Sequence, residues 1–193
     1  MANLTLSSAR TALLSMDFHT RIVNASPMTV ERNLVQNASK ALNAARRAGI
    51  PVLHIVVHPN PFFTSPRNKF MRRIRENIPV SSPQEIAELM KIVPELAPAE
   101  NETVVEKPRI GAFAGSNLET LLRSKDIDTL VLMGAVTEFV IESTARYAID
   151  YDYRVIILED CCIGFSYEAH NNSIKILEHM TDIASCADFV ESL

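Results

Sequence analysis

Short apolar runs alternate along the chain with longer segments in which apolar residues recur at helical spacing. The apolar runs predict strands at 11–17, 51–57, 103–107, 130–134, 154–158 and 183–186. The longer segments predict helices at 30–48, 137–150, 167–180 and 187–193. Strands that alternate with helices form right-handed crossovers to a parallel sheet, and strands that are apolar at consecutive positions are covered on both faces. The pattern therefore predicts one α/β domain over residues 1–193, with three layers (α/β/α) and a mostly parallel sheet.

Residues 59–82 interrupt this alternation and are expected to be irregular. They are rich in proline and carry the basic residues Arg67, Lys69, Arg72, Arg73 and Arg75. A loop of this length in a compact domain is often a lid, a binding loop or an arm that reaches a second subunit. The charges are consistent with recognition of an acidic substrate, and also with a solvated face or a subunit contact.

Composition removes several classes of function. The chain carries 19 Lys and Arg against 23 Asp and Glu, a net charge of −4, so it has no general basic field for nucleic acid or an acidic membrane surface. Its five glycines form neither G-x-G-x-x-G nor a P-loop, which excludes nucleotide binding by those loops. The most apolar run, at 130–136, is far shorter than the roughly 20 residues of a membrane helix. With no secretion signal and only three cysteines, the chain is expected to be cytoplasmic.

In a parallel sheet, ligands bind beyond the carboxyl ends of the strands. The residues that follow the predicted strands there are 17–19, 58–60, 134–137 and 159–162. Asp17 ends an apolar strand, where a carboxylate is costly to bury unless it is paired, so it is a candidate acid or base or else a structural cap. Lys107 ends another strand, and a lysine beside a buried carboxylate would keep that carboxylate ionised. The sequence leaves their pairing open.

Four segments resemble motifs of the isochorismatase-like hydrolases, the cysteine hydrolase superfamily, and they occur in that family's order. The first is the strand that ends in Asp17. The second, EKPRIGAFAGSNL at 106–118, is similar to a K…AF.GT.L motif. The third, GAVTEFVIESTA at 134–145, is similar to G-V-x-T-x-x-C-V-x-x-T-A. The fourth, from DYRVIILEDCC at 152–162 to SYEAH at 166–170, is similar to G-Y-x-V-x-V-x-x-D-A…S-x-E-x-H.

The resemblance implies a six-stranded parallel sheet in the order 3-2-1-4-5-6, and a homo-oligomer, dimer or higher. It also implies a triad of Asp, Lys and Cys, in which the thiolate attacks a small organic substrate. Backbone N–H groups after the fourth strand would hold the oxyanion, next to a cis peptide that falls at Ala135–Val136. By motif position, Asp17 and Lys107 match the triad, and Val140 stands at the position of the cysteine.

Valine cannot act as a nucleophile, so the resemblance implies chemistry without a covalent thiol step. Some members of the family that lack the cysteine hydrolyse a vinyl ether by acid catalysis. Asp17 would then be the acid and Lys107 its electrostatic partner, acting on a vinyl ether or a related bond. The remaining residues that the resemblance places around the substrate or oxyanion are His19, His58, Phe113, Ala135, Val136, Thr137 and Phe139. It implies no cofactor and no metal, because the family's metal-binding signature is missing and His54 and His58 stand without a carboxylate partner.

Two other interpretations stay open. A catalytically silent fold could serve binding or assembly, which the valine at position 140 favours and the retained Asp17 and Lys107 oppose. Thiol chemistry could instead use Cys161 or Cys162, although these follow the fifth strand rather than the fourth.

Overall fold

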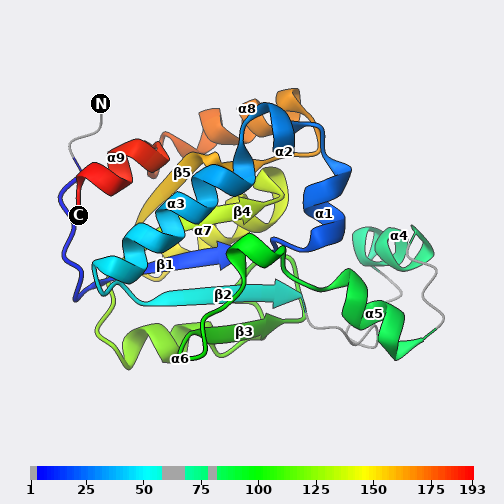
Figure 1. Ribbon diagram of the computed structural model, residues 1–193, viewed down its shortest axis with the longest axis horizontal. Helices are drawn as coiled ribbons and strands as arrows, with labels where there is room; N and C mark the ends of the chain where they lie inside the picture. The colour runs from blue at the N-terminus through cyan, green and yellow to red at the C-terminus, as the bar shows by residue number, and fades with distance from the viewer. Residues whose placement is uncertain (1–3, 58–67, 78–81) are drawn as a thin grey trace.

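The fold is described from a computed structural model, which covers residues 4–57, 68–77 and 82–193. Six strands form one parallel sheet in the order β3-β2-β1-β4-β5-β6 (Figure 1). The strands are β1 (Thr11–Met16), β2 (Val52–Val57), β3 (Thr103–Lys107), β4 (Thr129–Ala135), β5 (Arg154–Ile163) and β6 (Asp182–Ala184). The predicted α/β class and strand order are confirmed.

Helices cover both faces of the sheet. They are α1 (Thr20–Ala25), α2 (Met28–Glu31), α3 (Leu34–Arg47), α4 (Lys69–Asn77), α5 (Pro83–Leu89), α6 (Leu118–Arg123), α7 (Glu142–Asp150), α8 (Tyr167–Leu177) and α9 (Cys186–Glu191). A 3₁₀ turn, η2 (Pro94–Leu96), and a π-helical turn, η3 (Thr137–Ile141), complete the set. No helix in the described ranges is long and apolar enough to cross a membrane.

The sheet separates two apolar cores. On one face, α3 and α9 bury Leu42 and Phe189 against strand residues such as Leu13. On the other face, α6, α7 and α8 bury their apolar sides against strand residues such as Leu14. Figure 1 shows α3 in front of the strands, and α1, α4 and α5 beyond the arrowheads of β1 and β2. The carboxyl ends of the strands therefore face a region built by three short helices.

Several predicted elements differ from the structure at their ends, and four of the differences change the picture of the fold. The helix expected at 30–48 begins as α3 at Leu34, because Asn33 has a left-handed backbone with φ 52°. The segment expected to be irregular, 59–82, contains the helix α4. The helix expected at 137–150 begins with the wider turn η3. The fifth strand does not end at 158 but continues to Ile163 through a bulge.

Gly134 allows the ends of β1 and β4 to meet closely. Its φ is 152°, and a Cβ at this position would clash with the carbonyl oxygen of Met16. A side chain here would also lie 2.9 Å from the Met16 Cβ. Since only glycine fits, this residue brings the segment after β1 against the segment after β4, where the candidate site lies.

Candidate active site

Asp17 directly follows β1 and has a left-handed backbone with φ 52°. Its N–H donates to the carbonyl of Ile55 at 2.9 Å, which holds the turn against β2. Strand alternation would direct Asp17 to the face opposite Met16. The turn breaks this alternation, and the carboxylate instead contacts Lys107. Lys107 lies two positions after Val105 on β3, so strand alternation places it on the face that α6 and α7 cover. The left-handed conformation of Asp17 thus allows its carboxylate to pair with Lys107.

Asp17 and Lys107 form a buried ion pair. The Lys107 Nζ lies 2.8 Å from the Asp17 Oδ2, and the two side chains are only 1% and 7% exposed. Lys107 Nζ also donates to the carbonyl of Arg109 at 3.1 Å. Burial alone would raise the pKa of Asp17, but the Lys107 ammonium opposes it, and the pKa lies below its usual range. The resting site therefore contains a carboxylate.

His19 lies beside this pair, as the sequence suggested. Its Nδ1 is 2.7 Å from the carbonyl oxygen of Met90, and its Nε2 is 3.6 Å from Asp17 Oδ1. The chain around Met90 is fixed there because Thr20 N–H donates to the Lys91 carbonyl at 2.8 Å. His19 is therefore held between the catalytic candidate Asp17 and the segment that follows α5.

The turn after β4 combines a cis peptide, a buried valine and two backbone hydrogen bonds. The Ala135–Val136 peptide is cis, as predicted. Val140 lies in the π-helical turn and is buried. The N–H groups of Phe139 and Val140 both donate to the carbonyl of Val136, at 3.1 and 3.0 Å. The N–H groups of Phe139 and Val140 are therefore engaged within the turn.

Phe139 connects the turn to α4. Its ring lies 4.6 Å from that of Phe70 and 5.4 Å from that of Phe165, both in edge-to-face geometry. The basic helix of the 59–82 segment thus contacts the turn after β4. His58, which the resemblance placed near the substrate, lies outside the described residues.

A chain of hydrogen bonds supports Thr137 from behind. The Thr137 hydroxyl is 2.8 Å from His170 Nδ1, and His170 Nε2 is 2.8 Å from Glu159 Oε1. Arg32 contacts the same carboxylate oxygen at 2.5 Å. The His170 ring is fully buried, so the chain ties α8 and β5 to the first residue of the turn. Glu159 is one of the residues expected near the ligand because it follows a predicted strand, and His170 belongs to the S-x-E-x-H motif, but no sequence pattern joins either of them to Thr137.

Two other groups of candidates lie elsewhere. The Phe113 ring packs against Tyr151 and Tyr153, which precede β5. Phe113 therefore lies near the amino end of a strand, whereas Asp17 lies at the carboxyl end of β1. Cys161 and Cys162 are buried within β5. Burial raises the pKa of the Cys162 thiol to about 12, and contact with Cys186 raises that of Cys161. A thiolate at either position is therefore strongly disfavoured.

The histidine on β2 has a structural partner. His54 Nε2 lies 2.9 Å from Glu102 Oε2, and Arg46 contacts the same carboxylate at 2.7 Å. Within the described ranges, no group of three or more His, Cys, Asp and Glu side chains is arranged to hold a metal ion.

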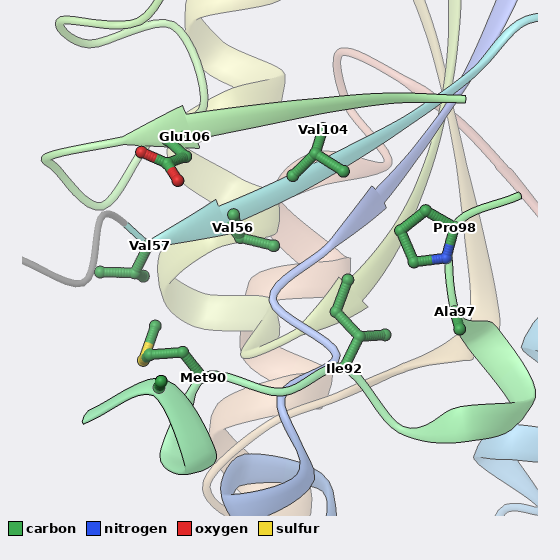
Figure 2. A pocket seen from close by; sticks show the side chains of 9 residues that line it. Val56, Val57, Met90, Ile92, Ala97, Pro98, Val104 and Glu106 are labelled. Carbon is green, nitrogen blue, oxygen red and sulfur yellow. The ribbon is translucent and has the colours of Figure 1, made fainter. Parts of the chain in front are cut away.

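An apolar groove of about 380 Å³ lies next to His19. Figure 2 shows Val56 and Val104 on its sheet side and Met90 and Ile92 on the other. Met90 connects the groove to the candidate active site, because its side chain lines the groove and its carbonyl oxygen accepts the hydrogen bond from His19.

Comparisons with known proteins agree with this architecture. Residues 11–188 match the model of the isochorismatase domain. The isochorismatase family protein YecD of Escherichia coli O157:H7, itself uncharacterized, is 30% identical over 98% of this chain and all of its own length. The N-carbamoylsarcosine amidase of an Arthrobacter species is 34% identical over 64% of this chain and 47% of its own. A cysteine hydrolase structure from Pseudomonas syringae pv. phaseolicola has a TM-score of 0.84 at 23% identity, over 98% of this chain and 94% of its own. The chain belongs to the isochorismatase family.

Proposed function

We propose that the protein hydrolyses a small organic substrate without a covalent enzyme intermediate, and that Asp17 transfers the protons while Lys107 holds its charge. The observation that carries the proposal is the buried ion pair at 2.8 Å, placed where β1 and β3 end. A buried ion pair contributes little to stability compared with apolar side chains. Its position beside the turn after β4 is better explained by chemistry.

The valine at position 140 is the reason that we propose a reaction without a covalent enzyme intermediate. Its motif position is that of the cysteine nucleophile, and an isopropyl group has no lone pair with which to attack. The other thiols considered, Cys161 and Cys162, are buried within β5. Water is then the nucleophile that a hydrolase has available.

The charge state of Asp17 decides the direction of proton transfer. A carboxylate that Lys107 keeps ionised is in the form that can accept a proton from water. The acid role expected from the resemblance would require Asp17 to be protonated first. The ionised state of Asp17 therefore favours its use as a general base, a role that suits a bond cleaved by addition of water to a carbonyl carbon. The amidase among the relatives suggests a carbamoyl or amide group as a first class of substrate to try.

Substitution of Asp17 by asparagine tests the proposed function. We expect Asp17→Asn to lower turnover by about 10²–10⁴-fold, since it removes the proton acceptor and keeps the shape. Asp126→Asn is the matched control, because Asp126 has the same left-handed backbone, φ 53°, at an exposed position. Turnover is measured on amides, ureides and vinyl ethers, with circular dichroism to check the fold. Unchanged turnover in Asp17→Asn would refute the dyad, and an inactive wild type across the panel would favour a silent binding fold.

The pH profile separates base from acid catalysis. Because the pKa of Asp17 is lowered, we expect kcat/KM to be level near neutrality and to fall only in strongly acidic solution, as the carboxylate is protonated. If Asp17 acts as the acid, kcat/KM will instead decline as the pH rises through that same pKa. The profile is recorded for the component of the rate that Asp17→Asn abolishes.

Substitution of Val140 by cysteine tests whether this position is that of the nucleophile. We expect Val140→Cys to add one thiol that reacts with iodoacetamide faster than the three buried cysteines of the wild type. Mass spectrometry after timed alkylation counts the modified thiols. A new thiol as inert as Cys162 would show that Val140 is not beside the Asp17 base.

A further inference from the structure

Two buried acceptor atoms face each other without a partner between them. These atoms are Asp17 Oδ1 and His19 Nε2, 3.6 Å apart. Neither makes a hydrogen bond within the described residues. The two residues are 5% and 1% exposed. A buried polar atom left unpaired is costly, so two such atoms in contact indicate a place for a bound group.

The hydrogen bond at Met90 fixes which ring nitrogen of His19 carries the proton. A carbonyl oxygen can only accept, so His19 Nδ1 must donate across the 2.7 Å contact with Met90. In a neutral ring, Nε2 then has a lone pair that faces the Asp17 carboxylate. A positively charged ring would add a second cation to a buried site in which Lys107 already balances Asp17 at 2.8 Å. The surroundings therefore favour the neutral form.

Two facing acceptors need a group that donates two hydrogens from a single atom. Water is the smallest such group, and it is the nucleophile that the proposed function requires. The site is also closed to bulk solvent by the burial of both side chains, which suits a single ordered molecule.

We propose that Asp17 Oδ1 and His19 Nε2 together bind the attacking water molecule and that His19 is a catalytic residue. One hydrogen of the water points to Asp17 and the other to His19. In the reaction, the water oxygen forms a bond to the carbonyl carbon of the substrate, the π electron pair of that carbonyl moves onto its oxygen, and the first water proton passes to Asp17. The oxyanion then re-forms the carbonyl, the bond from the carbon to the leaving nitrogen or oxygen breaks, and Asp17 returns the proton to the leaving atom. His19 Nε2 keeps its hydrogen bond to the new hydroxyl group, so it orients the water without changing charge.

A crystal structure of the ligand-free protein tests the water site independently of activity. Crystals are grown without ammonium or amines, so that a density peak at this place is water. We expect one peak within hydrogen-bonding distance of both Asp17 Oδ1 and His19 Nε2, and its loss in His19→Leu. A ring that closes directly onto the Asp17 carboxylate, with no peak between, would overturn the proposal.

Kinetics of His19 variants test the catalytic role, which rests on the proposed function. We expect His19→Leu to lower kcat by about 10²-fold with little change in KM, because it removes an acceptor for the water and not for the substrate. His19→Gln should recover part of kcat, since its amide oxygen can accept the same hydrogen bond. The control is His54→Gln, which changes another fully buried histidine, one paired with Glu102 at 2.9 Å.

The possible outcomes distinguish the two proposals. If Asp17→Asn abolishes turnover and His19→Leu does not lower kcat, the role of His19 is wrong and the proposed function stands. If the wild type turns over no substrate, the proposed function fails, and the crystal structures alone decide whether the water site exists. A KM that rises in His19→Leu at constant kcat would assign His19 to substrate binding and overturn the proposal.

Discussion

Replacing Lys107 with methionine is expected to lower the free energy of unfolding by about 3–5 kcal/mol at neutral pH, because it leaves the Asp17 carboxylate buried without its partner. Methionine fills a similar volume, so the loss comes from the charge. The double variant Asp17→Asn/Lys107→Met should recover much of the stability, since it removes both charges. Lys91→Met is the control, because Lys91 pairs with Glu88 at 2.6 Å with both side chains more than 60% exposed. Exposed pairs contribute about 1 kcal/mol or less.

The pH dependence of stability makes this prediction sharper. In the wild type, the lowered pKa of Asp17 means that its contribution to stability is present above the unfolded pKa of about 3.9 and is lost as the pH falls through the lower, folded value. In Lys107→Met only burial remains as the main influence, which raises the pKa. The free energy of unfolding of the variant should therefore rise as the pH is lowered from 7 to 4. Over the same range, the contribution of Asp17 to the stability of the wild type stays constant. Urea denaturation at several pH values measures both slopes, and identical slopes would contradict the assignment.

Gly134→Ala is expected to destabilise the protein by about 3 kcal/mol or more, because the added methyl group clashes with backbone atoms that cannot move away. The atom in contact is the carbonyl oxygen of Met16, which lies at the end of β1 next to Asp17. Gly49→Ala is a matched control. Gly49 also has a positive φ, 71°, but nothing lies within 4 Å of its added Cβ. Its cost should be limited to about 1–2 kcal/mol of backbone strain.

Thermal unfolding compares the two glycine variants directly. Equal losses would mean that backbone conformation, not the close approach to β1, makes Gly134 necessary. If Gly134→Ala is too unstable to purify, both variants are expressed at low temperature. Their rates of limited proteolysis then rank the stability of Gly134→Ala against that of Gly49→Ala.

The sheet was predictable from the sequence because its strands are apolar at consecutive positions. β3 agrees with its prediction at both ends, since Thr103–Lys107 is bounded by polar residues and a proline. The fifth strand was predicted too short because Glu159 and Asp160 interrupt its apolar run, although both belong to β5. The break before α3 was missed because apolar spacing continues through Asn33, and only its backbone angle ends the helical path.

The candidate site was predictable only in part. Strand ends identified Asp17 and Lys107, but a contact between residues 90 positions apart depends on strand order, which a local pattern does not contain. The resemblance supplied that order and the cis peptide at Ala135–Val136. It did not supply the support of Thr137 by His170, because that contact depends on how α8 packs against the turn.

The bulge in β5 determines which changes in chain length this fold can accept. Between the paired positions, β5 has four residues from Ile157 to Cys162 where β4 has one from Leu132 to Gly134. The surplus of three residues in β5 is an odd number, and yet Ile157 and Cys162 belong to the same core as Leu132. Leu158 and Cys161, three positions apart, both belong to the opposite core, so side chains do not alternate through the bulge. Related chains that keep this fold can therefore differ in length at this place by odd as well as by even numbers.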